Sequence, residues 1–477
     1  MSLTDAYVFD AVRTPFGKVG GALSGVRPDD MAAHVVRTLV DRAPGLEGLR
    51  AASAQAVADA AAGRPIEAGT DAAAPQRIDE VVFGNANGAG EENRNVARMA
   101  TLLAGLPLSI PGTTVNRLCG SSLDAAIIAS RQINTGEADV VLVGGVESMS
   151  RAPWVLPKTT RPFPMHDLAA ANTTLGWRLI NDAMPPEWTV SLGEATELLR
   201  ERFGISRERQ DEFAARSHRL TARAWDEGRY DSLVAAVPGT DLERDETVRP
   251  DSTPETLAGL RTVFRRENGT VTAGNASPMN DGASAALLGS STGADVLGLE
   301  PLARIAGRAT AANEPDFFGY APVEAVNRAL SRAGIGWKDV AAVELNEAFA
   351  AQSLACTDAW GVDPEIVNAW GGAIAIGHPL GASGTRVLGT LARRLEASGE
   401  RWGVAALCIG VGQGLALALT GEGYVCDCAA TAAEASEALA GGADEGGSPT
   451  PGGAPTASTA DDLAALDAAA PRGATAG

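Results

Sequence analysis

The chain has 477 residues, of which 45% are hydrophobic, so it is long enough to bury the cores of two or three domains. Its formal charge is −20, from 39 basic and 59 acidic residues, and it has no extended basic run. This balance excludes nucleic acid and anionic membrane surfaces as expected partners.

The start of the chain and its cysteines predict a reducing compartment. The opening MSLTDAYVFDAVRTPFGK has no basic leader before an apolar run, and no segment contains the ~18 uninterrupted apolar residues of a membrane helix. The five cysteines are too dispersed for a disulfide framework, so we interpret them as reduced thiols free for chemistry. We therefore expect a cytoplasmic protein with no membrane partner.

The first domain is predicted to span residues 1–147 and to carry a surface insertion. Residues 43–77 are rich in Ala and Gly and separate an early helical pattern from the strand pattern IDEVVFGNA. Clusters of small and turn-forming residues between periodic segments are typical of loops.

The segment NRLCGSSLDAAIIASRQI predicts a cysteine at a helix N-terminus. Small residues follow Cys119, and a regular helical pattern follows them. Free backbone N–H groups and the helix dipole favour an anionic sulfur there, and the same N–H groups could hold an oxyanion. The alternative is a small buried hydrophobic residue, which this segment alone favours.

Apolar strand patterns alternate with helical ones along the chain. ADVVLVGG and DVAAVELN are typical of buried strands, and PVEAVNRALSRAG is typical of a helix, so the sequence predicts an α/β fold. ADVVLVGGVESMS and RWGVAALCIGVGQG both run from a buried strand into glycines, which indicates two related halves.

Residues 148–266 form a polar region with many prolines, including APWVLPKTTRPFPMHD. Proline is rare inside a sheet, so we predict a loop-rich domain rather than a continuous sheet. Loops on a rigid scaffold commonly carry specificity.

In VELNEAFAAQ, Asn346 and Glu347 follow an apolar strand where a helix is predicted to begin. The carboxyl end of a strand is where α/β folds place their sites, and an asparagine there could orient a water. The alternative is that Asn346 caps the helix.

In NAWGGAIAIGHPLGASGTR, His378 lies between Gly377 and Pro379 in a glycine-rich loop. Such a loop lets the backbone approach a ligand closely and gives the imidazole little local packing. His378 is therefore our candidate base for a cysteine nucleophile. The alternative is a turn histidine hydrogen-bonded to the backbone.

In GVAALCIGVGQGLALAL, Cys408 ends a strand and meets glycines at 410, 412 and 414, which leave backbone N–H groups accessible. A thiol beside bare amides indicates proton transfer near a developing anion. The alternative is a packed strand cysteine.

The last residues, 422–477, are dominated by Ala, Gly, Pro, Ser and acidic residues and are nearly free of aromatics. This composition cannot bury enough surface to order itself, so we predict a disordered tail. Its pair Cys426 and Cys428 is too short and isolated a motif for zinc, and we expect no metal site.

Together, NRLCGSS, NEAFAA, NAWGGAIAIGHPLGASG and CIGVGQG resemble the four active-site loops of the thiolase family, in the same order. TAGNASPMNDGASAALL resembles the family's segment that contacts coenzyme A. The segments RTPFGKVGGALSGVRPDDMAA, GEENRNVARMATLLAGLP, GGVESMSRAPW and TTLGWRLIN are most similar to degradative β-ketoadipyl-CoA (3-oxoadipyl-CoA) thiolases. Three departures are Trp370 where related thiolases usually have Asn, a loose LGEATELL segment, and Ala126 after the nucleophile; we expect the first two to alter the acyl pocket.

The resemblance implies a fold of two duplicated α/β/α halves that form a five-layered core. The loop domain at 148–266 would be inserted in the N-terminal half, which would resume at 267–298. The C-terminal half would span residues 299–421.

The resemblance also implies the roles of the site residues. His378 would deprotonate Cys119, which would attack the 3-keto carbon of a 3-oxoacyl-CoA, and Cys408 would protonate the departing enolate of acetyl-CoA. His378 and a water held by Asn346 would stabilise that enolate, and the N–H groups of Cys119 and Gly410 would hold the tetrahedral intermediate. A second coenzyme A would resolve the acyl-enzyme, which gives ping-pong kinetics.

Coenzyme A would be a substrate, and no permanently bound cofactor is implied. Ser277 would contact its pantetheine arm. We expect one of Lys158, Arg161 and Arg223 to meet its phosphates or the distal carboxylate of 3-oxoadipyl-CoA; solvated surface charge is the alternative for each. A homodimer or homotetramer is implied as well.

Three other functions stay open at this stage. A biosynthetic acetoacetyl-CoA thiolase uses the same loops in the condensation direction. A ketosynthase-like enzyme would resemble a Cys-His-His or Cys-His-Asn pattern, which the Cys408 segment does not match. A non-catalytic relative that binds coenzyme A or lipid would have no need of intact Cys119 and His378.

Overall fold

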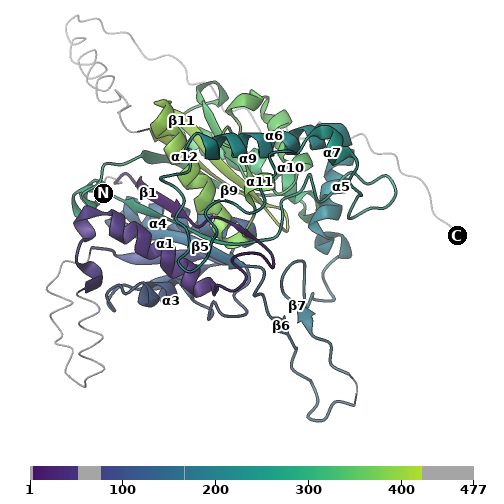
Figure 1. Ribbon diagram of the computed structural model, residues 1–477, viewed down its shortest axis with the longest axis horizontal. Coiled ribbons are helices and arrows are strands. Elements are labelled where there is room, and N and C mark those ends of the chain that lie inside the picture. Colours follow the sequence, from purple (N-terminus) through teal and green to yellow (C-terminus); the bar gives the residue numbers. More distant parts are fainter. Residues whose placement is uncertain (1–3, 52–76, 166, 422–477) are drawn as a thin grey trace, which may run out of the picture. The chain divides into compact units, whose positions relative to one another are not determined.

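The computed structural model describes residues 4–51, 77–165 and 167–421 (Figure 1). The helices of the described residues are α1 (Pro28–Arg42), α3 (Val96–Leu103), α4 (Ser121–Thr135), α5 (Leu192–Phe203), α6 (Arg207–Asp226), α7 (Pro254–Ala258), α8 (Ser291–Leu297), α9 (Ala321–Ala333), α10 (Ala350–Trp360), α11 (Ala373–Ile376) and α12 (Ser383–Ser398). The strands are β1 (Tyr7–Arg13), β2 (Gly17–Lys18), β3 (Glu80–Gly84), β4 (Gly112–Val115), β5 (Val140–Ser148), β6 (Trp154–Val155), β7 (Ala171–Asn172), β8 (Asn280–Gly289), β9 (Ala303–Ala312), β10 (Ala342–Leu345), β11 (Trp402–Ile409) and β12 (Gln413–Gly421).

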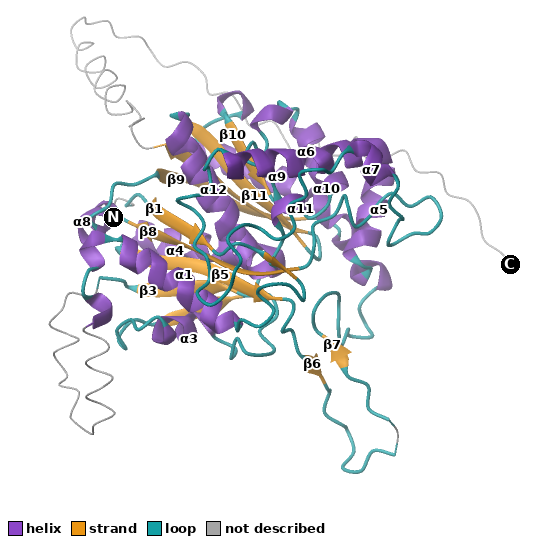
Figure 2. Cartoon of the chain, in the orientation of Figure 1, coloured by secondary structure: helices purple, strands orange, loops and turns teal. Residues whose placement is uncertain are grey.

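The long strands form one sheet in the order β10-β11-β12-β9-β1-β8-β5-β3-β4 (Figure 2). In one half β3 and β5 are parallel, and β5–β8 and β8–β1 are antiparallel. In the other half β10 and β11 are parallel, and β11–β12 and β12–β9 are antiparallel. The two half-sheets therefore repeat one pattern, with β5 and β11 in equivalent places. This confirms the two related halves expected from the two similar strand sequences.

Apolar side chains alternate between the two faces of these strands and build the layers. Val141 and Val143 of β5 pack in a central core, whereas Val140 and Leu142 pack in an outer one under α1. In β11 the alternation is the same, with Leu407 in the central core. The central core includes α4 and α12, and a third core lies under α9 and α10. The result is the predicted five-layered α/β arrangement: helices, half-sheet, helices, half-sheet, helices.

The proline-rich region has two different parts. β6 and β7 are two-residue strands that form a small separate ladder, and Figure 1 shows them and their connecting loop projecting away from the sheet. The second part is helical: Ser191 caps α5 and Ser206 caps α6, each accepting a backbone N–H through its hydroxyl. The predicted boundaries of this region stay predictions.

Most of the predicted insertion at 43–77 lies outside the described residues, as does the predicted tail at 422–477 with its two cysteines. In the described part of the chain, no helix has the length and hydrophobicity needed to cross a bilayer.

Candidate active site

A strained turn places Cys119 directly ahead of α4. Leu118 has a φ of 46°, in the left-handed region that leucine rarely adopts, and a single 3-10 turn follows before α4 begins at Ser121. Cys119 is 5% exposed and lines a cavity of about 330 Å³, here called the Cys119 cavity. The thiol is thus covered by protein but open to a bound ligand.

Of the predicted site residues, His378, Gly410 and Ser277 also line the Cys119 cavity. Asn346 and Cys408 are fully buried and are not among its lining residues. Ser277 donates from its hydroxyl to the carbonyl of Ala348, 3.1 Å away. The structure therefore gathers four of the predicted residues around one space.

His378 is oriented by two neighbours. The hydroxyl of Ser383 donates to the carbonyl of Pro379 (3.0 Å), so its lone pair accepts from Nδ1–H of His378 (2.6 Å). This assignment leaves Nε2 as the unprotonated, basic nitrogen, with Nδ2 of Asn346 3.4 Å away. Asn280 accepts the backbone N–H of His378 (3.1 Å), and Gly377 has a φ of 113° with no room for a side chain beside Asn280.

Burial keeps both the thiol and the imidazole neutral at rest. Burial raises the pKa of Cys119 to about 12, although the N–H groups of Gly410 and of Cys119 itself hydrogen-bond the sulfur and oppose the rise. Burial also lowers the pKa of His378 to about 3, with a smaller effect from Arg386. Desolvation of Cys119 thus outweighs the amides that favour an anionic sulfur at a helix start.

Asn346 is held in a fixed orientation by a buried cation. Arg386 donates to Oδ1 of Asn346 (2.9 Å), which turns Nδ2 toward His378, 3.4 Å from each ring nitrogen. The alternative role of Asn346 as a helix cap was wrong, since α10 begins at Ala350 with Phe349 at its cap position. Arg386 was not predicted as a site residue, because no sequence pattern shows that an arginine within a helix is buried.

Cys408 lies near the end of β11, opposite Gly414 of β12. It packs with Phe318 and Phe349 and is fully buried. Burial raises the pKa of Cys408 well above its usual range, and proximity to Cys119 raises it further. Cys408 is therefore a neutral, buried thiol near Cys119.

Glu147, at the end of β5, is a cavity residue that the sequence reasoning missed. Its carboxylate accepts N–H groups from Ala86 (2.9 Å), Asn87 (3.1 Å) and Gly381 (2.9 Å). Burial raises the pKa of Glu147 to about 7, against the effect of these amides. The sequence feature that could have identified Glu147 is its place as a single carboxylate at the end of an apolar strand pattern.

None of Lys158, Arg161 and Arg223 lines the Cys119 cavity, and all three are exposed. Arg178 does line it, which the sequence reasoning did not foresee. Trp370 does not line it either: it packs on Tyr230, whereas the LGEATELL segment does contribute Leu192 and Gly193.

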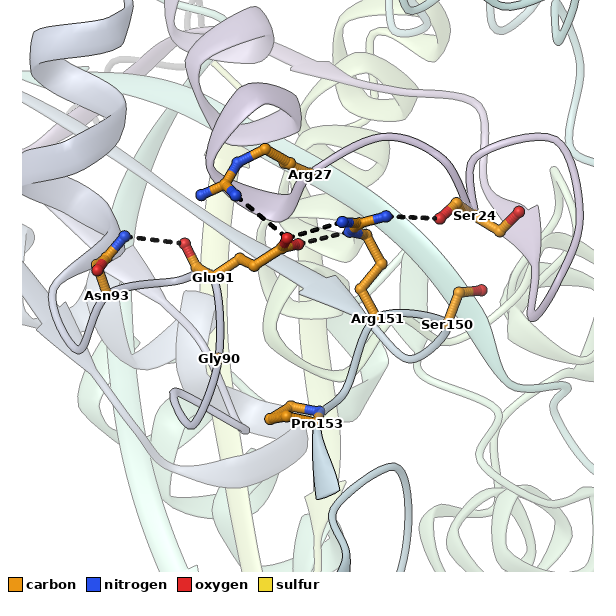
Figure 3. Close-up of a pocket in the computed structure, with 8 residues that line it drawn as sticks. All are labelled: Ser24, Arg27, Gly90, Glu91, Asn93, Ser150, Arg151 and Pro153. Atoms are coloured by element: carbon orange, nitrogen blue, oxygen red, sulfur yellow. Dashed lines mark hydrogen bonds and ion pairs between the residues drawn. The ribbon is translucent and has the colours of Figure 1, made fainter. Parts of the chain in front are cut away.

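A more open pocket of about 550 Å³ contains none of the predicted site residues (Figure 3). Its two arginines, Arg27 and Arg151, are both paired with Glu91, at 3.1 Å and 2.7 Å. Within the described ranges, no group of three or more His, Cys, Asp or Glu side chains could hold a metal ion.

Comparisons with known proteins cover most of the chain. A family model described as the thiolase N-terminal domain matches residues 47–292, and one described as the thiolase C-terminal domain matches residues 299–421. The chain is 45% identical to a β-ketoadipyl-CoA thiolase of Escherichia coli, over 87% of this chain and 99% of that protein. It is 44% identical to a β-ketoadipyl-CoA thiolase of Pseudomonas aeruginosa, over 87% of this chain and 98% of that protein.

Two solved structures share the fold. The Bacillus anthracis acetyl-CoA acetyltransferase is 34% identical, with a TM-score of 0.76 over 88% of this chain and 99% of that chain. Human mitochondrial 3-ketoacyl-CoA thiolase is 32% identical, with a TM-score of 0.76 over 88% of this chain and all of that chain.

Proposed function

The chain belongs to the thiolase family, and on that premise we propose that it cleaves 3-oxoadipyl-CoA with coenzyme A to acetyl-CoA and succinyl-CoA. The observation that carries the proposal is the Cys119 cavity, which is lined by Cys119, Gly410 and His378 and in which the N–H of Gly410 hydrogen-bonds the sulfur. The substrate is supported by the names of the relatives that share 45% and 44% of their residues with this chain.

In the first step, His378 takes the proton of Cys119 as the sulfur attacks the 3-keto carbon. Both groups are neutral at rest, so proton transfer is coupled to formation of the carbon–sulfur bond. The oxyanion that forms is stabilised by the N–H groups of Cys119 and Gly410, which already hydrogen-bond the resting sulfur.

In the second step, the bond between carbons 2 and 3 breaks and the enolate of acetyl-CoA leaves. Its thioester oxygen carries the developing charge and is stabilised by His378 and by a water held on Asn346, whose amide is oriented by Arg386. Cys408 protonates carbon 2, as a neutral buried thiol next to the nucleophile can do.

A second coenzyme A then releases the acyl group from Cys119. Its thiol gives its proton to the thiolate left on Cys408 and its sulfur attacks the acyl-enzyme, and protonated His378 returns its proton to Cys119, which leaves as the thiol. Ser277, on the cavity wall, is proposed to contact the pantetheine arm. Coenzyme A is a substrate here, and the proposal requires no resident cofactor or metal.

The likeness to the B. anthracis acetyl-CoA acetyltransferase favours a second candidate, the condensation of two acetyl-CoA molecules. The test is kcat/KM for thiolysis of 3-oxoadipyl-CoA, of acetoacetyl-CoA and of a medium-chain 3-oxoacyl-CoA. A large preference for the dicarboxylate supports the first candidate. Equal or faster cleavage of acetoacetyl-CoA would withdraw it in favour of the second.

A homodimer or homotetramer in the cytoplasm also belongs to this proposal. An oligomer is supported by the large apolar side chains exposed between β6 and α5, among them Phe163, Met165 and Leu179. Mass photometry of the full chain would measure the oligomeric state.

A further inference from the structure

Arg178 brings a positive charge into a cavity that is otherwise mostly apolar. It lies between β7 and α5, is half-buried, and is the one lysine or arginine among the described residues that line the Cys119 cavity. Surface arginines are common, but a cation facing a substrate cavity is costly unless it meets an anion.

The guanidinium of Arg178 has neutral partners only. It donates to Oδ1 of Asn87 (3.1 Å) and weakly to the carbonyl of Thr173 (3.5 Å). No carboxylate of the described residues lies within 4.0 Å, in contrast to Arg27 and Arg151, which share Glu91 in the open pocket of Figure 3. Arg178 therefore retains unused donors and an uncompensated charge.

The neighbours of Arg178 fix its place on the cavity wall. Nδ2 of Asn87 donates to the hydroxyl of Thr173 (3.1 Å), so the amide oxygen is left to face Arg178. The backbone N–H of Asn87 bonds Glu147, whose other oxygen accepts N–H groups from Ala86 and Gly381. Glu147, the cavity's carboxyl group, is thus fully occupied by backbone amides and is no partner for Arg178.

We infer that Arg178 binds the distal carboxylate of the acyl group and selects 3-oxoacyl-CoA substrates that end in a carboxylate. This inference rests on the proposed function. Only two methylene groups separate the keto carbon of 3-oxoadipyl-CoA from its terminal carboxylate, so both ends of this acyl group must lie within one small cavity. A planar guanidinium matches a carboxylate with two parallel hydrogen bonds.

The same contact protects the acyl-enzyme. A succinyl thioester on Cys119 can be lost by intramolecular cyclisation. The carboxylate oxygen of the succinyl group attacks the thioester carbon, and Cys119 leaves as a thiolate. The cyclic anhydride that forms then reacts with water to give succinate. Such ring closures are fast when the groups are free to meet. Arg178 holds the carboxylate away from the thioester until coenzyme A arrives.

The first experiment compares 3-oxoadipyl-CoA with 3-oxohexanoyl-CoA, which has a methyl group in place of the carboxylate. In Arg178→Gln the ratio of the two kcat/KM values falls at least about 30-fold, because a charged partner is lost. Arg178→Lys restores part of the ratio, since it keeps the charge without the planar pair of donors. Arg328→Gln, on the exposed face of α9 and outside the Cys119 cavity, keeps the wild-type ratio as the matched control.

The second readout is the lifetime of the acyl-enzyme without added coenzyme A, followed by intact-mass spectrometry. Arg178→Gln shortens the lifetime of the succinyl-enzyme and releases succinate, whereas the butyryl-enzyme lifetime changes less. A merely structural role would shorten both equally.

The outcomes separate this inference from the proposed function. If the wild-type protein does not prefer 3-oxoadipyl-CoA, the substrate proposal fails and the inference fails with it. If the wild type prefers it and Arg178→Gln keeps that preference, the inference alone is overturned. An unchanged ratio with a raised KM for coenzyme A would assign Arg178 to the coenzyme phosphates instead and would equally overturn it.

Discussion

The two halves of the molecule repeat one strand pattern but contribute different chemistry to the site. The N-terminal half supplies Cys119, at a strained turn where the sulfur faces the cavity. The C-terminal half supplies His378 and Cys408, which transfer protons in the proposed mechanism, and Asn346, which is proposed to hold a water. At the ends of the equivalent strands β5 and β11, one half has Glu147 and the other has Cys408. In the proposed mechanism, the N-terminal half therefore forms the carbon–sulfur bond and the C-terminal half moves the protons, although the two half-sheets share one strand pattern.

Substitution of Cys119, the proposed nucleophile, is expected to have the largest effect on activity. In Cys119→Ala, thiolysis falls by at least about 10⁴-fold, because no covalent intermediate can form. Steady-state rates and intact-mass detection of the acyl-enzyme measure this. Cys356→Ala is the control, since Cys356 is a buried free thiol that does not line the cavity, and it keeps activity within about threefold. Acylation that persists in Cys119→Ala would contradict the assignment.

A change in the C-terminal half is expected to have a smaller effect. Asn346→Asp keeps the shape and lets Arg386 pair with a carboxylate, but it removes the N–H donors that face His378. We expect kcat to fall by about 100-fold, the cost of one lost oxyanion donor, with little change in Tm. A variant with wild-type kcat would show that the amide only supports the fold.

The smallest expected effect is the pH dependence of the reactivity of the Cys119 thiol in the resting protein. Because the pKa of Cys119 is raised to about 12, its thiolate fraction is minute at pH 7 and grows about tenfold with each pH unit. Iodoacetamide alkylation of the Cys119 peptide should therefore rise steadily from pH 7 to pH 9. A plateau below pH 8 would mean that the amides of Cys119 and Gly410 outweigh desolvation.

The candidate site residues that could be predicted from the sequence are those in unusual local sequence patterns. Cys119 before a helix, His378 among glycines and Cys408 before alternate glycines all lie where those patterns place them. The alternation of strands and helices likewise predicted the layers, since period and burial are local properties.

What could not be predicted depends on tertiary packing. Arg386 lies on an ordinary helical pattern, yet it is buried against Asn346. Lys158 and Arg161 looked as suitable as any cation of the proline-rich region, but among the cations that the structure describes only Arg178 lines the Cys119 cavity. The direction of a side chain in an irregular loop has no periodicity to reveal it, so charge and composition alone did not single out Arg178, and contact of Lys158, Arg161 or Arg223 with coenzyme A stays a prediction.

Cys408→Ala shows whether the nucleophile and the proton donor are separate thiols. Exchange of labelled coenzyme A into butyryl-CoA needs the acyl-Cys119 intermediate but no protonation of carbon, whereas cleavage of a 3-oxoacyl-CoA needs both. We predict that exchange falls less than about tenfold while cleavage falls about 10³-fold, the usual contribution of a positioned acid. Equal losses in the two reactions would contradict separate roles for the two thiols and leave Cys408 as a packing residue of β11.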